Sequence, residues 1–184
     1  MEQAEIVAVI EEATHQRGWI SNGYAQVEFL LGDLIMRCRE FPRYAEQTQI
    51  FTHSAVKRVR KVRSMLAIDG PLTAHAQTIG EVLDAFEVNH DIRNLLAHGF
   101  CEFHFTPTDD AAMVFRKYER GDVQNGQEPD ILVQRTFRLI DLQYHRAQLV
   151  AQSQRALEVF AKVHFDLGWG DLDPASLKNG WTHT

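Results

Sequence analysis

The sequence has 184 residues, of which 45% are hydrophobic and 24% are charged, and its formal net charge is -6 at pH 7. This composition is typical of a soluble globular protein and excludes a disordered or fibrous chain, and the length predicts a single domain over residues 1–184. The negative charge argues against a protein that coats nucleic acid nonspecifically, because that mode of binding needs many lysines and arginines to neutralise phosphates.

Cysteine content and hydropathy predict the cellular compartment. The two cysteines, Cys38 and Cys101, are too few for a disulfide framework, and no charged, apolar leader opens the sequence. No apolar run approaches the ~18 residues that a membrane-spanning helix needs. We therefore expect a cytoplasmic protein with no membrane partner.

Apolar residues at helical spacing predict two helices near the N-terminus. The first covers about 3–16 and closes near Gly18. The second covers 24–39, begins at an N-cap supplied by Ser21 or Asn22, and ends before Pro42. Its apolar face consists of Tyr24, Val27, Leu31, Leu34 and Cys38.

Two more helices are predicted before residue 100. In the helix over about 53–68, an apolar stripe runs between cations, and the Gly-Pro pair at 70–71 ends it. The next helix begins near Thr73 and continues to His98, where Gly99 terminates it. The helical part of the chain is therefore expected to cover about 3–98.

The hydrophobic period changes from helix to strand after Gly99. Apolar and polar residues alternate over 101–105, which is the two-residue repeat of a strand with one buried face. The segments 114–118 and 131–139 are predicted to be two further strands, joined by polar turns. A small antiparallel sheet is thus expected over about 101–139.

A last long helix and a polar tail complete the chain. Asp141 is the expected N-cap of a helix over about 141–165. The tail, 167–184, is rich in glycine, and its tryptophans, Trp169 and Trp181, could dock on the domain. The apolar faces of the helices should form one core that includes Val27, Leu31, Leu34, Phe86, Leu95 and Phe160.

The helix that ends at His98 carries a polar stripe. On an ideal helix at roughly 100° per residue, its members fall within a sector of about 60°. They are Glu87, Asp91, Asn94 and His98, and they lie opposite Val88, Ile92, Leu95 and Leu96. Arg93 is roughly 140° from His98, so the two converge only through long side chains, a distorted helix end or a second subunit.

The run Arg93-Asn94-Leu95-Leu96-Ala97-His98-Gly99 resembles the signature of the HEPN superfamily, in which an arginine and a polar residue are followed a few residues later by a histidine. HEPN proteins are helical bundles with this signature toward the end of a late helix, after an amphipathic helix like 24–39. The resemblance covers about residues 20–165. It implies a mainly α fold, a HEPN-like helical bundle with the small sheet inserted before the last long helix.

The resemblance also implies an activity, that of a metal-independent endoribonuclease of toxin or defence type. In such enzymes the RNA 2'-hydroxyl attacks the adjacent phosphate. His98 would move the proton, Arg93 would hold the phosphate, and Asn94 would orient His98 or the RNA. The resemblance further implies a homodimer whose two motifs share a cleft, RNA as substrate, no cofactor, and an inhibitory antitoxin such as the nucleotidyltransferase-like proteins paired with some HEPN proteins.

Two other interpretations of the Arg93-to-His98 motif stay open. In the first, the chain is a noncatalytic HEPN-like binding or interaction module, in which the motif organises a dimer interface or holds a ligand. In the second, the residues are structural: His98 favours the negative end of the helix dipole, and Arg93 pairs with Glu87, Asp91 or another acid.

Further polar residues are secondary candidates for binding RNA. The segment 57–63 places five cations in seven residues and contributes Lys57, Arg60 and Lys61. Glu87 and Asp91 of the polar stripe complete this set. A basic run of this kind is more often a solvated helix face than an RNA groove.

A metal site is not expected. His98, Cys101 and His104 have zinc-like spacing. Residues 101 and 104 of a strand, however, point to opposite faces. No glycine-rich phosphate loop or nucleophile elbow occurs either, so nucleotide hydrolysis and serine chemistry are unsupported.

Overall fold

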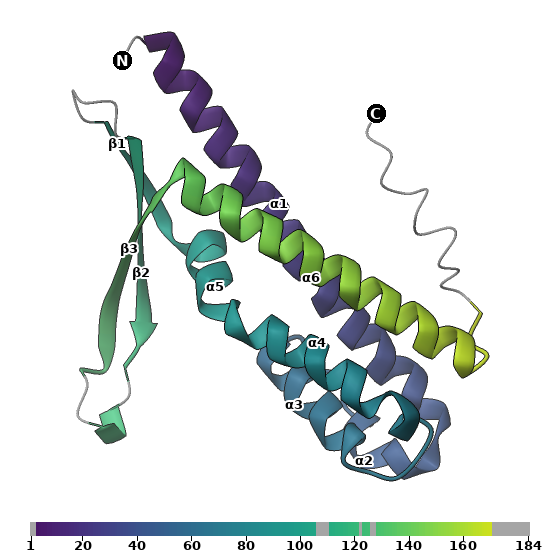
Figure 1. The fold of residues 1–184 in the computed structure, drawn as a ribbon. Coiled ribbons are helices and arrows are strands. Elements are labelled where there is room, and N and C mark those ends of the chain that lie inside the picture. Colours follow the sequence, from purple (N-terminus) through teal and green to yellow (C-terminus); the bar gives the residue numbers. More distant parts are fainter. Residues whose placement is uncertain (1–2, 106–110, 122, 126–127, 171–184) are drawn as a thin grey trace. The chain divides into compact units, whose positions relative to one another are not determined.

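The computed structural model describes residues 3–105, 111–121, 123–125 and 128–170. The chain is mainly helical, and a small three-stranded antiparallel sheet precedes the last long helix (Figure 1), as the sequence predicted. Trp181 lies outside the described residues. Within those residues, no helix combines the length and the hydropathy needed to cross a membrane.

The chain divides into two compact units. One, here called the sheet unit, consists of residues 1–22 and 89–150, and the other, the helical unit, consists of residues 23–88 and 151–184. Each of the two long helices contributes to both units. The assignment of 1–184 to one domain stays a prediction.

The first helix, α1, runs without interruption over Gln3–Arg37. The prediction of two helices that meet near Gly18 is therefore wrong. A single glycine in a helix costs only about 1 kcal/mol, and neither Ser21 nor Asn22 stops a helix by itself. A buried stripe at intervals of three or four residues continues through this region, and it consists of Ala13, Gln16, Ile20, Tyr24, Val27, Leu31 and Leu34.

Three short helices and three 3₁₀ turns follow α1 in the helical unit before its last helix. They are α2 (Ala45–Thr48), α3 (Ala55–Leu66), α4 (Ala76–Val88) and single 3₁₀ turns at Cys38–Glu40, Pro42–Tyr44 and Thr73–His75. The Tyr24 ring packs edge-on against Phe86 at a centroid distance of 5.2 Å. The buried Tyr44 hydroxyl accepts a hydrogen bond from the Leu72 amide at 3.1 Å. The ring contact joins α1 to α4, and the hydrogen bond joins the turn at Pro42–Tyr44 to the residue that precedes the turn at Thr73–His75.

The sequence predicted one helix from Thr73 to His98, but the structure has two, because the helical conformation is interrupted at Asn89. The two helices are α4 and α5 (His90–His98). Asn89 has φ -104° and ψ 6°, outside the helical region. Valine and asparagine are poor helix formers, and Val88 is 78% exposed, so no buried apolar stripe carries the helix across this point. Glu87 and His98 consequently belong to different helices.

The sheet contains β1 (Phe100–Phe105), β2 (Ala111–Arg120) and β3 (Asp130–Arg138) in the order β1-β2-β3. It is antiparallel throughout, with β2 in the middle. One face is buried through Met113, Phe115 and Phe137, and the last two rings contact each other edge-on at 5.7 Å. The alternation seen in the sequence thus predicted these strands correctly.

The last helix, α6, covers Leu139–Asp166. Asp141 is its third residue and not its N-cap, as the sequence had suggested. Its Oδ2 accepts a hydrogen bond from the Arg138 backbone amide at 2.8 Å, which is one half of a capping box. The carboxylate therefore stabilises the start of α6 from inside the helix.

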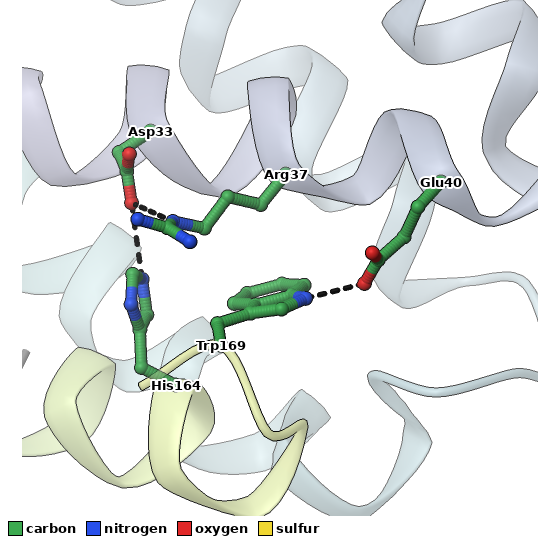
Figure 2. A network of polar contacts seen from close by, with 5 residues as sticks. All are labelled: Asp33, Arg37, Glu40, His164 and Trp169. Atoms are coloured by element: carbon green, nitrogen blue, oxygen red, sulfur yellow. Dashed lines mark hydrogen bonds and ion pairs between the residues drawn. The ribbon is translucent and has the colours of Figure 1, made fainter. Parts of the chain in front are cut away.

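A polar cluster in the helical unit holds the end of α6 against α1. The Oδ2 atom of Asp33 lies 3.0 Å from the Arg37 Nε and 3.0 Å from the Nε2 of the buried His164. Gly168, with φ 72°, turns the chain after α6 so that the Trp169 indole covers Arg37 and donates to Glu40 (Figure 2). Trp169 thus docks as expected.

All six residues predicted for the core are buried. Five of them, Val27, Leu31, Leu34, Phe86 and Phe160, belong to the helical unit. The sixth, Leu95, is 2% exposed and belongs to the sheet unit.

Candidate functional site

The signature residues lie on α5, a nine-residue helix of the sheet unit. Leu95 and Leu96 are buried on one side of it. His90, Asn94 and His98 recur every four residues, so they follow one another along a single face. The buried leucines fix the rotation of the helix and leave this polar face available for chemistry.

Gly99 ends α5 as predicted, but the reason is steric. Its φ of -75° is accessible to any residue, and its amide donates to the Leu95 carbonyl at 2.7 Å. A Cβ atom at this position would collide with that same carbonyl oxygen. Glycine therefore allows the chain to pass from His98 directly into β1.

Asn94 joins Arg93 to a histidine, His90, that is not among the site residues predicted from the sequence. The Arg93 Nη1 donates to Asn94 Oδ1 at 3.0 Å, and Asn94 Nδ2 lies 2.9 Å from His90 Nε2. Because the amide nitrogen is a donor, this geometry needs a lone pair on the His90 Nε2. The four-residue spacing between His90 and Asn94 was the signal that would have identified this histidine.

The contact between Arg93 and Asn94 reduces the effect of the angle that separates Arg93 from His98 on the helical wheel. On the wheel, Arg93 projects away from the polar face of the helix, but its guanidinium reaches the side chain of Asn94, which is on that face. The long arginine side chain thus compensates for part of the separation within one subunit. His98 is exposed one turn beyond Asn94, and its side chain makes no hydrogen bond or ion pair with any described residue.

Arg17 of α1 holds the C-terminal end of α5. Its Nε donates to the Leu96 carbonyl oxygen, one of the carbonyls that a helix end leaves without an internal partner. Its guanidinium also lies over the Phe115 ring, 5.3 Å from the centroid. The sequence gave no signal for this residue, because 79 positions separate the two hydrogen-bonding partners. Arg17 therefore helps to position the helix end that carries His98.

Glu87 has a partner within the helical unit. Its Oε2 lies 2.5 Å from the Arg63 Nη2, and Asp84 Oδ1 lies 2.6 Å from the same nitrogen. These two hydrogen bonds raise the pKa of Arg63. Asp91, in contrast, is exposed at the start of α5 in the sheet unit. The polar stripe of the sequence is thus divided between two helices.

The basic run of α3 is partly used in packing. Lys61 Nζ donates to the carbonyls of Gln47 at 2.7 Å and Ile50 at 2.6 Å, so it closes the segment that precedes α3. Arg58 similarly donates to the Thr52 and Glu28 carbonyls. Lys57 and Arg60 are exposed, and they remain the two candidates of this run with side chains directed to solvent.

The zinc-like trio does not form a cluster. Cys101 is half-buried, and burial raises the pKa of its thiol while nearby Arg17 opposes that rise. His104 is exposed and lies 3.4 Å from Glu102. Within the described ranges, no group of three or more histidine, cysteine or acidic side chains could hold a metal ion.

No family model, curated protein or solved structure matches this chain. The chemistry of α5 is therefore interpreted from its own residues. A guanidinium, an amide and an imidazole form one hydrogen-bonded row, and a second imidazole is open to solvent one turn further on. Such a set can bind an anion and transfer a proton.

Proposed function

We propose that this protein is a metal-independent endoribonuclease of the HEPN type that acts as a homodimer in the cytoplasm. The observation that carries the proposal is the pairing of Arg93 with Asn94, because it turns a guanidinium toward the helix face on which the exposed His98 lies. A fork of N–H donors matches phosphate oxygens, and an exposed imidazole can exchange protons with water and substrate near neutral pH.

The proposed reaction is a transesterification within the RNA. The 2'-oxygen forms a bond to the adjacent phosphorus, and the bond from phosphorus to the 5'-oxygen of the next nucleotide breaks. One imidazole accepts the proton of the 2'-hydroxyl, and a second protonates the departing 5'-oxygen. Arg93 stabilises the charge that develops on the phosphate. The products are a 2',3'-cyclic phosphate and a 5'-hydroxyl.

Two imidazoles are needed, and a homodimer supplies them. Each subunit contributes one His98, so that one acts as the base and the other as the acid in a shared cleft. His90 is a poorer choice for this role, because its Nε2 is occupied by Asn94. Unregulated RNA cleavage is toxic to a cell, so the proposal includes an inhibitory partner protein, such as a nucleotidyltransferase-like antitoxin.

A noncatalytic binding module is the second candidate. The observation that favours it is the same hydrogen-bonded row, since Arg93, Asn94 and His90 are engaged with one another. In that case the row would organise a ligand or a subunit interface, and RNA would be bound without being cut.

Cleavage of a defined RNA in excess chelator separates the two candidates. The wild-type protein should cut the RNA, His98→Ala should lose at least about a hundredfold in rate, a typical contribution of general acid-base catalysis, and dimerisation should persist. His53→Ala, which removes another exposed histidine, should cut at the wild-type rate. Binding without cleavage by the wild type would favour the module, and a cleavage rate unaffected by His98→Ala would contradict the proposed mechanism.

A further inference from the structure

The sheet has a second face, opposite the one that carries Met113, Phe115 and Phe137; Val114 on this second face is buried, whereas Tyr118 and Arg120 further along β2 are exposed. Residues directly opposite each other in an antiparallel pair share a face. Phe100 pairs with Arg116, and Arg116 pairs with Gln134, so these three form one row across the sheet. Tyr118 and Leu132 form the next row on the same face. We call this surface the open face.

The aromatic side chains of the open face are largely exposed. Phe100 is 68% exposed and Tyr118 is 74% exposed, whereas Met113 and Phe115 on the other face are each 1% exposed. Leu132, beside Tyr118, is 52% exposed. Contiguous exposed apolar side chains that are rimmed by polar residues are typical of an interaction surface. The two rings are therefore available to a ligand.

Arg116 lies at the centre of the open face in a fixed orientation. Its Nη1 donates to Glu102 on β1, and its Nε donates to Gln134 on β3 at 2.8 Å. The hydrogen bond from Arg116 also lowers the pKa of Glu102. The guanidinium is thus held between both neighbouring strands, and a planar guanidinium can stack on a nucleic-acid base as an aromatic ring does.

The charge of the open face suits a polyanion. The strand register places Arg116, Arg120 and Arg138 on this face together with the carboxylates Glu102 and Asp130. Three cations against two anions give a positive balance on a chain whose net charge is -6. The formal charge of the open face is therefore opposite in sign to that of the whole chain.

The open face also begins beside the candidate site. Phe100 follows His98 after a single glycine, so their Cα atoms are at most about 7 Å apart. The aromatic rows therefore extend from the end of α5 that carries the proposed catalytic histidine.

We infer that the open face binds single-stranded RNA, with unpaired bases stacked on Phe100 and Tyr118 and the guanidinium of Arg116 between them. The inference rests on the proposed function in one respect, namely that the bound strand continues to His98. A single strand is specified because the bases of a duplex are already stacked on one another and cannot cover a protein ring.

The test is the affinity for a fluorescein-labelled single-stranded RNA, measured by fluorescence anisotropy with the full chain carrying His98→Ala to prevent cleavage. In that background, Tyr118→Ala should weaken binding about tenfold or more, which is the usual effect of removing one stacking ring. Tyr118→Phe keeps the ring and should bind within about twofold of the parent. A duplex of the same sequence should bind more weakly than the single strand.

Tyr144→Ala is the matched control, because Tyr144 is 62% exposed and belongs to α6 and not to the open face. Equal affinity of the Tyr118→Ala and Tyr144→Ala variants would overturn the inference. So would a change in sedimentation of Tyr118→Ala without loss of RNA affinity, since the open face would then join two copies of the chain. Cleavage by the wild type is measured separately. If Tyr118→Ala leaves cleavage unchanged, RNA binding at the open face is contradicted but the proposed nuclease is not. If RNA affinity depends on Tyr118 but the wild type does not cleave, the proposed nuclease is contradicted but RNA binding at the open face is not.

Discussion

Arg17→Met should destabilise the protein by about 2–3 kcal/mol. Methionine keeps most of the apolar stem of arginine but removes the donor to the Leu96 carbonyl and the guanidinium over Phe115. A hydrogen bond from a charged group contributes about 1.5–3 kcal/mol, and a cation–π contact contributes about 0.5–2 kcal/mol. Arg17 is partly exposed, so solvent screening places the sum toward the lower end of these ranges.

The assay is equilibrium unfolding in urea, followed by far-UV circular dichroism and compared with Arg155→Met. Arg155 pairs with Glu158 at 3.9 Å, and both side chains are more than half exposed, so its replacement should cost less than about 0.5 kcal/mol. If Arg17→Met lost no more than Arg155→Met, Arg17 would not be holding the end of α5. The Arg17→Met variant should also cleave RNA more slowly than the wild type, because the end of α5 that Arg17 holds carries His98.

Three further outcomes follow from burial and from side-chain chemistry. Phe160→Ala should lower the free energy of unfolding by about 3–5 kcal/mol, whereas Phe165→Ala, at a 78% exposed position of the same helix, should change it by less than about 0.5 kcal/mol in urea unfolding. Burial, aided by Glu40, raises the pKa of Cys38 to about 12, so iodoacetamide at pH 8 should alkylate the less buried Cys101 first, as peptide mass spectrometry would show. Arg93→Lys should restore little of the cleavage lost in Arg93→Ala, because an ammonium lacks the planar fork, and equal rates for Arg93→Lys and the wild type would exclude a bidentate phosphate contact.

The spacing of apolar residues predicted those helices and strands that bury one face along their whole length. Alternation after Gly99 identified the strands, and the spacing of valines between cations identified α3. Where stop signals were weak, the prediction failed. Gly18 lies within α1, since the buried stripe continues through it, whereas Asn89 breaks an apparently continuous helix at the point where Val88 has no core to pack against.

The candidate site was predictable only in part, because its supporting contacts are not local. The signature from Arg93 to His98 is contiguous and lies at a helix end, as the sequence indicated. The contact between Arg17 and Leu96 joins distant segments and has no sequence pattern. Lys61 has a structural contact that the sequence did not indicate, because its ammonium donates to backbone carbonyls of the segment before α3.

The open face illustrates why strand pairing matters for such predictions. Phe100 and Tyr118 belong to different strands, and only the register between β1 and β2 shows that they share a face with Arg116. The sequence reveals alternation along each strand, but it does not reveal which residues of two strands stand opposite each other.

Cleavage of an RNA that carries a single 2'-deoxy substitution at the cleavage position tests the proposed chemistry most directly. The substitution removes the attacking hydroxyl and leaves the phosphate and the bases in place. We expect the unmodified RNA to be cut in excess EDTA to a 2',3'-cyclic phosphate, and we expect the substituted RNA to bind with similar affinity but to stay intact. Cutting of the substituted RNA at the same position and rate would contradict attack by the 2'-hydroxyl, and with it the roles proposed for Arg93 and His98.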